Sequence, residues 1–195
     1  RLLSTSGIYS LDACRASFTR ADSVAGFYSS RFRWATCMEA VRNQPYDIII
    51  KADDYNGDQN LSDIDNFQIK VLGPSPVLQG LSPEGKFMRL EWINYGTDAI
   101  MGFNIYRREG TSSFTPDTCT SGIPSSAGYV RVGYIAGNSV IAYLDTNEGE
   151  GLEFNKEYSY RITAVFNNGA ESKASNELAS SLVSGVPVIT NVSVR

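Results

Sequence analysis

The chain contains no histidine, and three of its 195 residues are cysteine. The absence of histidine removes the commonest general base and the commonest transition-metal ligand. Cys14, Cys37 and Cys119 lack the close spacing that zinc ligands show in a sequence. Paired carboxylates that could hydrolyse a glycoside lack a cleft-forming context as well. We therefore expect no catalytic residues, and the chain is predicted not to be an enzyme.

Long apolar runs and basic clusters are also missing. No run approaches the roughly 20 residues of a membrane-spanning helix. The net charge is −4 with acids and bases mixed along the whole length, and no basic stripe of the kind that binds nucleic acid is present. We expect neither a membrane span nor a nucleic-acid partner. No signal peptide is visible at Arg1, so we expect a piece of a longer protein.

Apolar side chains recur at every second position through most of the chain, which is typical of β-strands. Hydrophobic residues make up 42% of the sequence, enough for a packed core. Tyr46, Ile48, Ile50 and Ala52 share one face of a predicted strand, and residues 66–71 repeat the pattern. These two segments predict a hairpin that is closed by a polar loop over residues 53–65.

A break at Gly73-Pro-Ser-Pro76 divides the chain. Proline removes a ladder hydrogen bond and restricts the residue before it, so this stretch predicts a short, stiff linker. The predicted fold is all-β, with two β-sandwich modules in tandem. Residues 1–72 form the first module and residues 73–185 the second. Residues 186–195 begin a following module or form a tail.

The second module shows seven alternating segments with turn signals between them, as a β-sandwich requires. They include Phe87–Trp92, residues 102–107, 129–135, 140–144 and 158–165, and a last strand within 171–182. A long segment rich in glycine, serine, threonine and proline, residues 110–128, interrupts them and contains Cys119. We expect this segment to be a flexible loop.

Leu152 stands six residues before Tyr158, which leads an alternating segment. This spacing resembles the fibronectin type III family, in which the tyrosine hydroxyl reaches back to upstream backbone in a tyrosine corner. Trp92 resembles the family's buried tryptophan of strand B, whereas Phe154 replaces the usual proline between the leucine and the tyrosine. The resemblance covers residues 76–184. It implies a sandwich that serves as a spacer or adhesion surface.

A narrower resemblance is to multidomain bacterial surface proteins of the gliding-motility-associated type. The first module resembles a partial cadherin-like or immunoglobulin-like domain, with earlier strands expected upstream of Arg1. Such domains often place a cysteine in strand F, where this chain has Ser159, so the pairing of Cys119 stays open. The supporting residues are Phe32-x-Trp34-x-x-Cys37, Pro45-Tyr46, Ile105-Tyr-Arg-Arg108 and Cys119-x-x-Gly122-x-Pro124.

Oxygen-bearing side chains recur in the predicted 53–65 loop with the spacing of an EF-hand. Counting from the first, they occupy positions 1, 3, 5, 7 and 12, which predicts a calcium site. Glutamine at position 6 replaces the usual glycine, and the flanks read as strands. The alternative is a solvated hairpin loop, since turns use the same residues. The candidate ligands are Asp54, Asn56, Asp58, Asn60 and Asp65.

Cys14 and Cys37 are candidates for a disulfide in an exported protein, which would contribute roughly 3 kcal/mol. Two buried free thiols are the alternative. Trp34 and Trp92 each lie on the apolar face of a strand, so both are predicted to be core residues.

The function that these observations predict is a structural or adhesion-type fragment of a secreted or cell-surface multidomain protein. It would act as a spacer or interaction module whose first partners are other domains of the same chain. The alternative is an accessory module that binds a glycan or a protein, with calcium as the one candidate cofactor.

Overall fold

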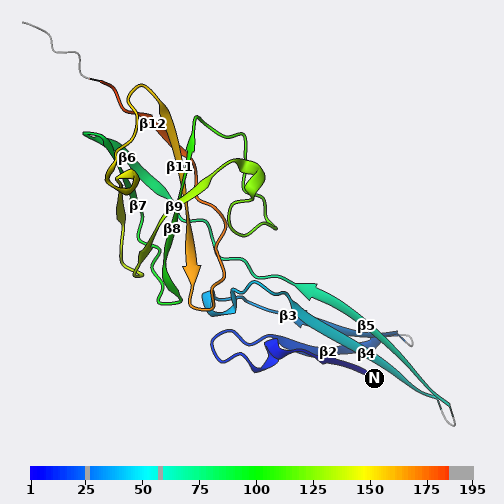
Figure 1. The fold of residues 1–195 in the computed structure, drawn as a ribbon. Helices are drawn as coiled ribbons and strands as arrows, with labels where there is room; N and C mark the ends of the chain where they lie inside the picture. Colours follow the sequence, from blue (N-terminus) through cyan, green and yellow to red (C-terminus); the bar gives the residue numbers. More distant parts are fainter. Residues whose placement is uncertain (25–26, 57–58, 185–195) are drawn as a thin grey trace, which may run out of the picture.

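The computed structural model describes residues 1–24, 27–56 and 59–184 (Figure 1). The prediction of an all-β chain is confirmed, because its regular elements are strands and short 3-10 turns. Within the described residues, no helix has the length and apolar character needed to cross a membrane. The predicted tail at residues 186–195 lies outside the described residues. The 3-10 turns are η1 (Gly7–Ser10), η2 (Met38–Ala40), η3 (Ser125–Ala127) and η4 (Asn147–Gly149).

The first module consists of a three-stranded sheet and a two-stranded sheet. β1 (Leu2–Thr5), β4 (Tyr46–Asn56) and β5 (Gln59–Ile69) form an antiparallel sheet in the order β1-β4-β5. β2 (Ser17–Val24) and β3 (Phe27–Arg33) form a separate hairpin. Figure 1 shows both long hairpins reaching away from the second module.

The core of the first module lies near the second module. Tyr46 and Ile48 of β4 are buried, together with Ile8 of η1 and Ala40 of η2. Toward the hairpin tips the side chains become exposed, and Leu61 of β5 leaves 70% of its surface open. The module is therefore well packed at one end and open at the other.

The predicted 53–65 loop is wrong. β4 and β5 pair continuously from Tyr46 opposite Ile69 to Asn56 opposite Gln59. The aspartates and asparagines of this stretch that belong to the described residues therefore lie in strands. Pairing along a complete neighbouring strand outweighs the weak local preference of these residues for turns.

The second module is a sandwich of two antiparallel sheets, as the sequence predicts. One sheet has the order β10-β7-β6, from β6 (Leu78–Glu84), β7 (Phe87–Trp92) and β10 (Ala142–Asp145). The other has the order β12-β11-β8-β9, from β8 (Ile100–Glu109), β9 (Val130–Ala136), β11 (Glu157–Phe166) and β12 (Leu178–Ser181).

Alternate side chains of both sheets fill the space between them. The core residues include Leu90 and Trp92 of β7, Phe103 of β8, and Tyr160 and Ile162 of β11, and all five are fully buried. The rings of Trp92 and Phe103 lie 5.2 Å apart between centroids. Apolar side chains thus occupy the interior, which is the reason the alternating pattern forms a sandwich.

The segment between the modules is held against the second one. Gly73 is buried, and a Cβ built on it would lie 2.4 Å from the ring of Phe166. Lys173 donates its backbone N–H to the Gly73 carbonyl, and the Tyr95 hydroxyl donates to the Pro74 carbonyl at 2.6 Å. The predicted stiff linker is therefore also a docked one.

Candidate functional site

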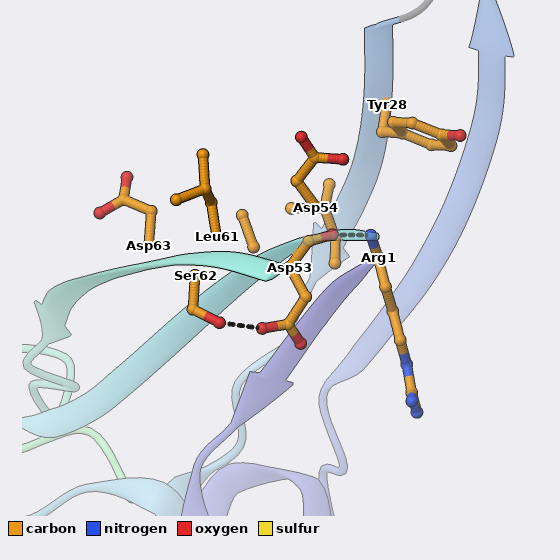
Figure 2. A pocket seen from close by; sticks show the side chains of 9 residues that line it. Arg1, Tyr28, Asp53, Asp54, Leu61, Ser62 and Asp63 are labelled. Carbon is orange, nitrogen blue, oxygen red and sulfur yellow. Dashed lines mark hydrogen bonds between the residues drawn. The ribbon is translucent and has the colours of Figure 1, made fainter. Parts of the chain in front are cut away.

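The open end of the first module contains a hollow of 450 Å³. Its walls come from β1, β3, β4 and β5. Figure 2 shows Asp54, Leu61 and Asp63 on the same side of the β4–β5 ribbon, with Tyr28 of β3 nearby. An aromatic ring, an aliphatic side chain and two carboxylates therefore border one open surface.

The opposite side of the same ribbon carries a tight polar contact. Asp53 Oδ1 accepts from the Ser62 hydroxyl at 2.6 Å and lies 2.8 Å from Lys51 Nζ. The hydrogen bond from Lys51, followed by that from Ser62, holds the pKa of Asp53 below its usual value. Figure 2 shows the Asp53–Ser62 bond on the other side of the ribbon from Asp54, Leu61 and Asp63, where it links β4 to β5.

The structure does not bring the predicted calcium ligands together. Asp54 lies opposite Leu61, whereas Asp65 lies opposite Ile50, four residues back along β4. Four residues of strand span about 13 Å, whereas calcium ligands lie about 2.3–2.6 Å from the ion. Asp54 and Asp65 therefore cannot hold one calcium ion between them.

The other three predicted calcium ligands are placed in different ways. Asn56 is the last residue of β4, Asn60 belongs to β5, and Asp58 lies outside the described residues. Within residues 1–24, 27–56 and 59–184, no group of three or more acidic, cysteine or histidine side chains could hold a metal ion.

Cys14 and Cys37 are joined by a disulfide in the structure. Trp34 lies beside it and donates its indole N–H to the Cys14 carbonyl at 2.7 Å. Its ring meets Tyr46 edge-on at 5.0 Å between centroids. The disulfide and these two aromatic rings thus tie the η2 region to the base of β4. Cys119 is free and exposed.

Leu152 and Tyr158 are both buried in the second module. The Tyr158 hydroxyl accepts the backbone N–H of Glu153 at 3.2 Å, which is the backward reach of a tyrosine corner. Trp92 is fully buried, and its indole N–H has no hydrogen-bond partner within the described residues. All three residues serve the packing of the sandwich.

The 110–128 segment is tied down on the outer face of β11 by Arg161, which the sequence did not single out. The Arg161 guanidinium donates to the Phe114 carbonyl at 2.9 Å, to the Ser175 carbonyl at 2.6 Å and to Glu177 Oε2 at 3.0 Å. Glu177 in turn accepts the Ser112 N–H. The expected flexible loop is therefore a covering strap. A signal was present, since an arginine at an alternate position of a buried strand needs partners.

A second buried ion pair also escaped the sequence reading. Arg107 of β8 and Asp145 of β10 lie 2.8 Å apart, and the Asp145 side chain is 2% exposed. The Tyr160 hydroxyl donates to the same carboxylate at 2.8 Å. Burial, with the nearby Asp145 charge second, raises the pKa of Tyr160 above its usual value. The pair joins the two sheets of the sandwich.

No protein-family model and no curated protein matches the chain. Solved structures with a similar part include pectate lyase PelI from Erwinia chrysanthemi in complex with tetragalacturonic acid, at 18% identity and a TM-score of 0.39 over 54% of this chain. A β-1,2-glucanase from Parabacteroides distasonis shares 21% identity at a TM-score of 0.39 over 67% of this chain. The spore cortex lytic enzyme SleM from Clostridium perfringens shares 14% identity at a TM-score of 0.39 over 68% of this chain.

These matches cover 28%, 17% and 37% of the three larger chains. The prediction that the chain is not an enzyme is corrected here, because all three larger chains are enzymes. An enzymatic role of the chain is therefore no longer excluded. Structural similarity at a TM-score of 0.39 assigns no activity to it.

Proposed function

We propose that the chain is a spacer and interaction segment of a longer secreted or cell-surface protein. Its two modules would hold a fixed relative orientation and so set the distance between the parts on either side. This proposal places no restriction on the activity of the protein that carries the modules.

The observation that carries the proposal is the packed joint between the modules. Gly73 lies against Phe166 with no room for a Cβ atom. On the other side of the joint, Asn168, in the turn after β11, donates its side-chain N–H to the Val41 carbonyl of the first module at 2.7 Å. The Gly73–Phe166 contact holds the linker against the second module, and the Asn168–Val41 hydrogen bond joins the two modules directly. Together they would restrict bending and rotation between the modules.

Two further observations support the proposed type of module and the proposed location outside the cell. The strand orders β10-β7-β6 and β12-β11-β8-β9, with the Tyr158 corner, support our proposal that the second module is fibronectin type III-like. The Cys14–Cys37 disulfide supports an oxidising compartment such as the cell exterior.

The test is the distribution of distances between the modules. Spin labels at Arg33→Cys and Val130→Cys, in a Cys119→Ser background, report this distance by pulsed electron resonance. We expect one narrow distribution for the native joint. Gly73→Ala should broaden it, because the new Cβ displaces the Phe166 ring. Gly7→Ala is the matched control, since a Cβ there meets no atom within 4 Å.

A broad distribution with the native joint would contradict the spacer proposal. So would an equal width for Gly73→Ala and Gly7→Ala, because the contact at the joint would then not set the orientation. Thermal unfolding of each variant shows whether the modules themselves stay folded.

The second candidate is an accessory module that binds a glycan or a protein at the open end of the first module. The hollow beside Tyr28, Leu61, Asp54 and Asp63 favours it, because aromatic and carboxylate groups together contact sugars and polar peptides. A rise in melting temperature with a ligand from a glycan or peptide panel would support this candidate.

A further inference from the structure

β5 is an edge strand of eleven residues. The sheet order β1-β4-β5 gives β4 two neighbours and β5 one, and no further strand of the described ranges 1–24, 27–56 and 59–184 pairs with β5. An edge strand presents unpaired N–H and C=O groups that can pair with a strand from another chain. The outer edge of β5 is therefore a surface on which strand addition is geometrically open.

The direction of each β5 amide follows from the pairing on the other side of β4. Arg1 and Asp53 exchange backbone hydrogen bonds, so the polar groups of Asp53 point toward β1. Those of its neighbours along β4 then point toward β5, because strand residues alternate. With Ala52 opposite Asp63, the amides of Ile64 and Asn66 point to the open edge.

The N–H groups of these two amides already donate hydrogen bonds to carboxylates. The N–H of Ile64 donates to Asp63 Oδ1 at 3.0 Å, and the N–H of Asn66 donates to Asp65 Oδ1 at 2.8 Å. Each aspartate thus covers the amide of the residue that follows it. A neutral strand would have to displace two charge-assisted hydrogen bonds before it could pair here.

The exposed side chains of this edge have a definite order. On one face, Leu61, Asp63, Asp65 and Phe67 follow each other as apolar, acidic, acidic and apolar; on the other face Ile64 is 64% exposed. β5 contains no lysine or arginine. The complementary strand is therefore apolar at both ends, with two basic residues around a central apolar one.

A second copy of this chain does not fit the edge. Antiparallel pairing of β5 with itself about Ile64 would place Asp63 opposite Asp65 on both sides. Like charges directly opposite each other destabilise a strand pair. Charge complementarity favours a cationic partner instead.

We propose that the outer edge of β5 binds an extended cationic polypeptide segment by strand addition. Basic side chains of the partner draw the Asp63 and Asp65 carboxylates away from the Ile64 and Asn66 amides. Those amides then donate to carbonyls of the partner. The two aspartates act as a charge filter that admits a basic strand and rejects neutral or acidic ones. This site is distinct from the joint at Gly73, so the proposal does not rest on the spacer function.

The test uses the whole chain and a labelled peptide, acetyl-Ile-Thr-Lys-Val-Lys-Thr-Ile-amide, followed by fluorescence anisotropy at low and high salt. The control peptides carry glutamate in place of both lysines, or N-methyl groups on the amides that would face β5. We expect the lysine peptide to bind and both control peptides not to bind. Its affinity should fall about tenfold or more in the Asp63→Asn/Asp65→Asn variant, and it should also fall at high salt.

Ile64→Pro gives a second test on the protein side. It removes an amide that faces the open edge and leaves the pairing with β4 intact, a position that strands tolerate for proline. Binding should be lost while circular dichroism and melting temperature stay near those of the native chain. Should Ile64→Pro unfold, the N-methylated peptide makes the same distinction on the native chain.

Four results would overturn the proposal. One is no binding of the lysine peptide at millimolar concentration. Another is binding that survives N-methylation, and a third is binding that is unchanged by Asp63→Asn/Asp65→Asn. The last is an asparagine variant that self-associates or binds neutral strands while the native chain ignores the lysine peptide, since the aspartates would then only keep the edge unpaired.

Discussion

Removal of the Cys14–Cys37 disulfide should destabilise the first module selectively. The two cysteines are 23 residues apart in the sequence. Closing a loop of that length in the unfolded chain corresponds to a stabilisation of about 3 kcal/mol at 25 °C. The first module has a small core at one end and an open hollow at the other, so a loss of this size is a large part of what holds it folded.

The two tryptophans make the selectivity measurable. Trp34 lies beside the disulfide and Trp92 lies in the core of the second module. In a Trp92→Phe background the fluorescence therefore follows the first module, and in a Trp34→Phe background it follows the second. Urea titration of Cys14→Ala/Cys37→Ala should move the Trp34 transition down by about 1–3 M, as the usual urea slope for small proteins implies.

The Trp92 transition should move much less, because the contacts across the joint are few. Cys119→Ala is the control, since this cysteine is exposed and forms no disulfide. An unchanged Trp34 transition would refute the assignment of stability to the disulfide. Equal shifts of both transitions would refute independent modules and indicate one cooperative unit.

Two further changes probe the second module. Asp145→Ala leaves Arg107 without its buried partner and should cost about 3–5 kcal/mol by Trp92-monitored unfolding, whereas the exposed Glu150→Ala should change little. Burial raises the pKa of Glu177, but the hydrogen bonds from Ser112 and Arg161 outweigh it and keep the net pKa below the usual 4.5. Its contribution to stability is therefore complete above pH 4.5 and lost as the pH falls through the lowered pKa; Glu177→Gln should flatten this acid loss, and an unchanged acid limb would contradict it.

The sandwich of the second module was predictable because each strand carries its own signal. Met88, Leu90 and Trp92 alternate with polar residues within six positions, and Tyr160, Ile162 and Ala164 do the same in β11. Such a pattern is local, so it can be read without knowledge of the partner strand. The tyrosine corner is equally local, since leucine and tyrosine are six residues apart.

The first part of β5, residues 59–65, was missed because the apolar residues there do not alternate, whereas residues 66–69 at its end lie within the predicted 66–71 strand. Leu61, Ile64 and Phe67 are spaced by three, and aspartates and asparagines lie between them. The strand exists through its ladder with β4, where the Ser62 hydroxyl also donates a hydrogen bond to Asp53 Oδ1. Neither partner can be inferred from the other's local sequence. The candidate site at this end of the module was therefore beyond prediction, and the calcium spacing was a product of the same polar composition.

The 110–128 strap shows why composition alone misjudges order. Glycine, serine, threonine and proline favour irregular backbone, and irregular backbone was read as a mobile loop. A buried guanidinium needs several acceptors, and Arg161 obtains two of them from the carbonyls of Phe114 and Ser175, 47 and 14 residues away. Ser159, in the strand position where the resembling domains often have a cysteine, donates to the Gly110 carbonyl at 2.6 Å and anchors the start of the strap. Hydrogen bonds from Ser159 and Arg161 thus hold the strap, and Cys119 is free and exposed.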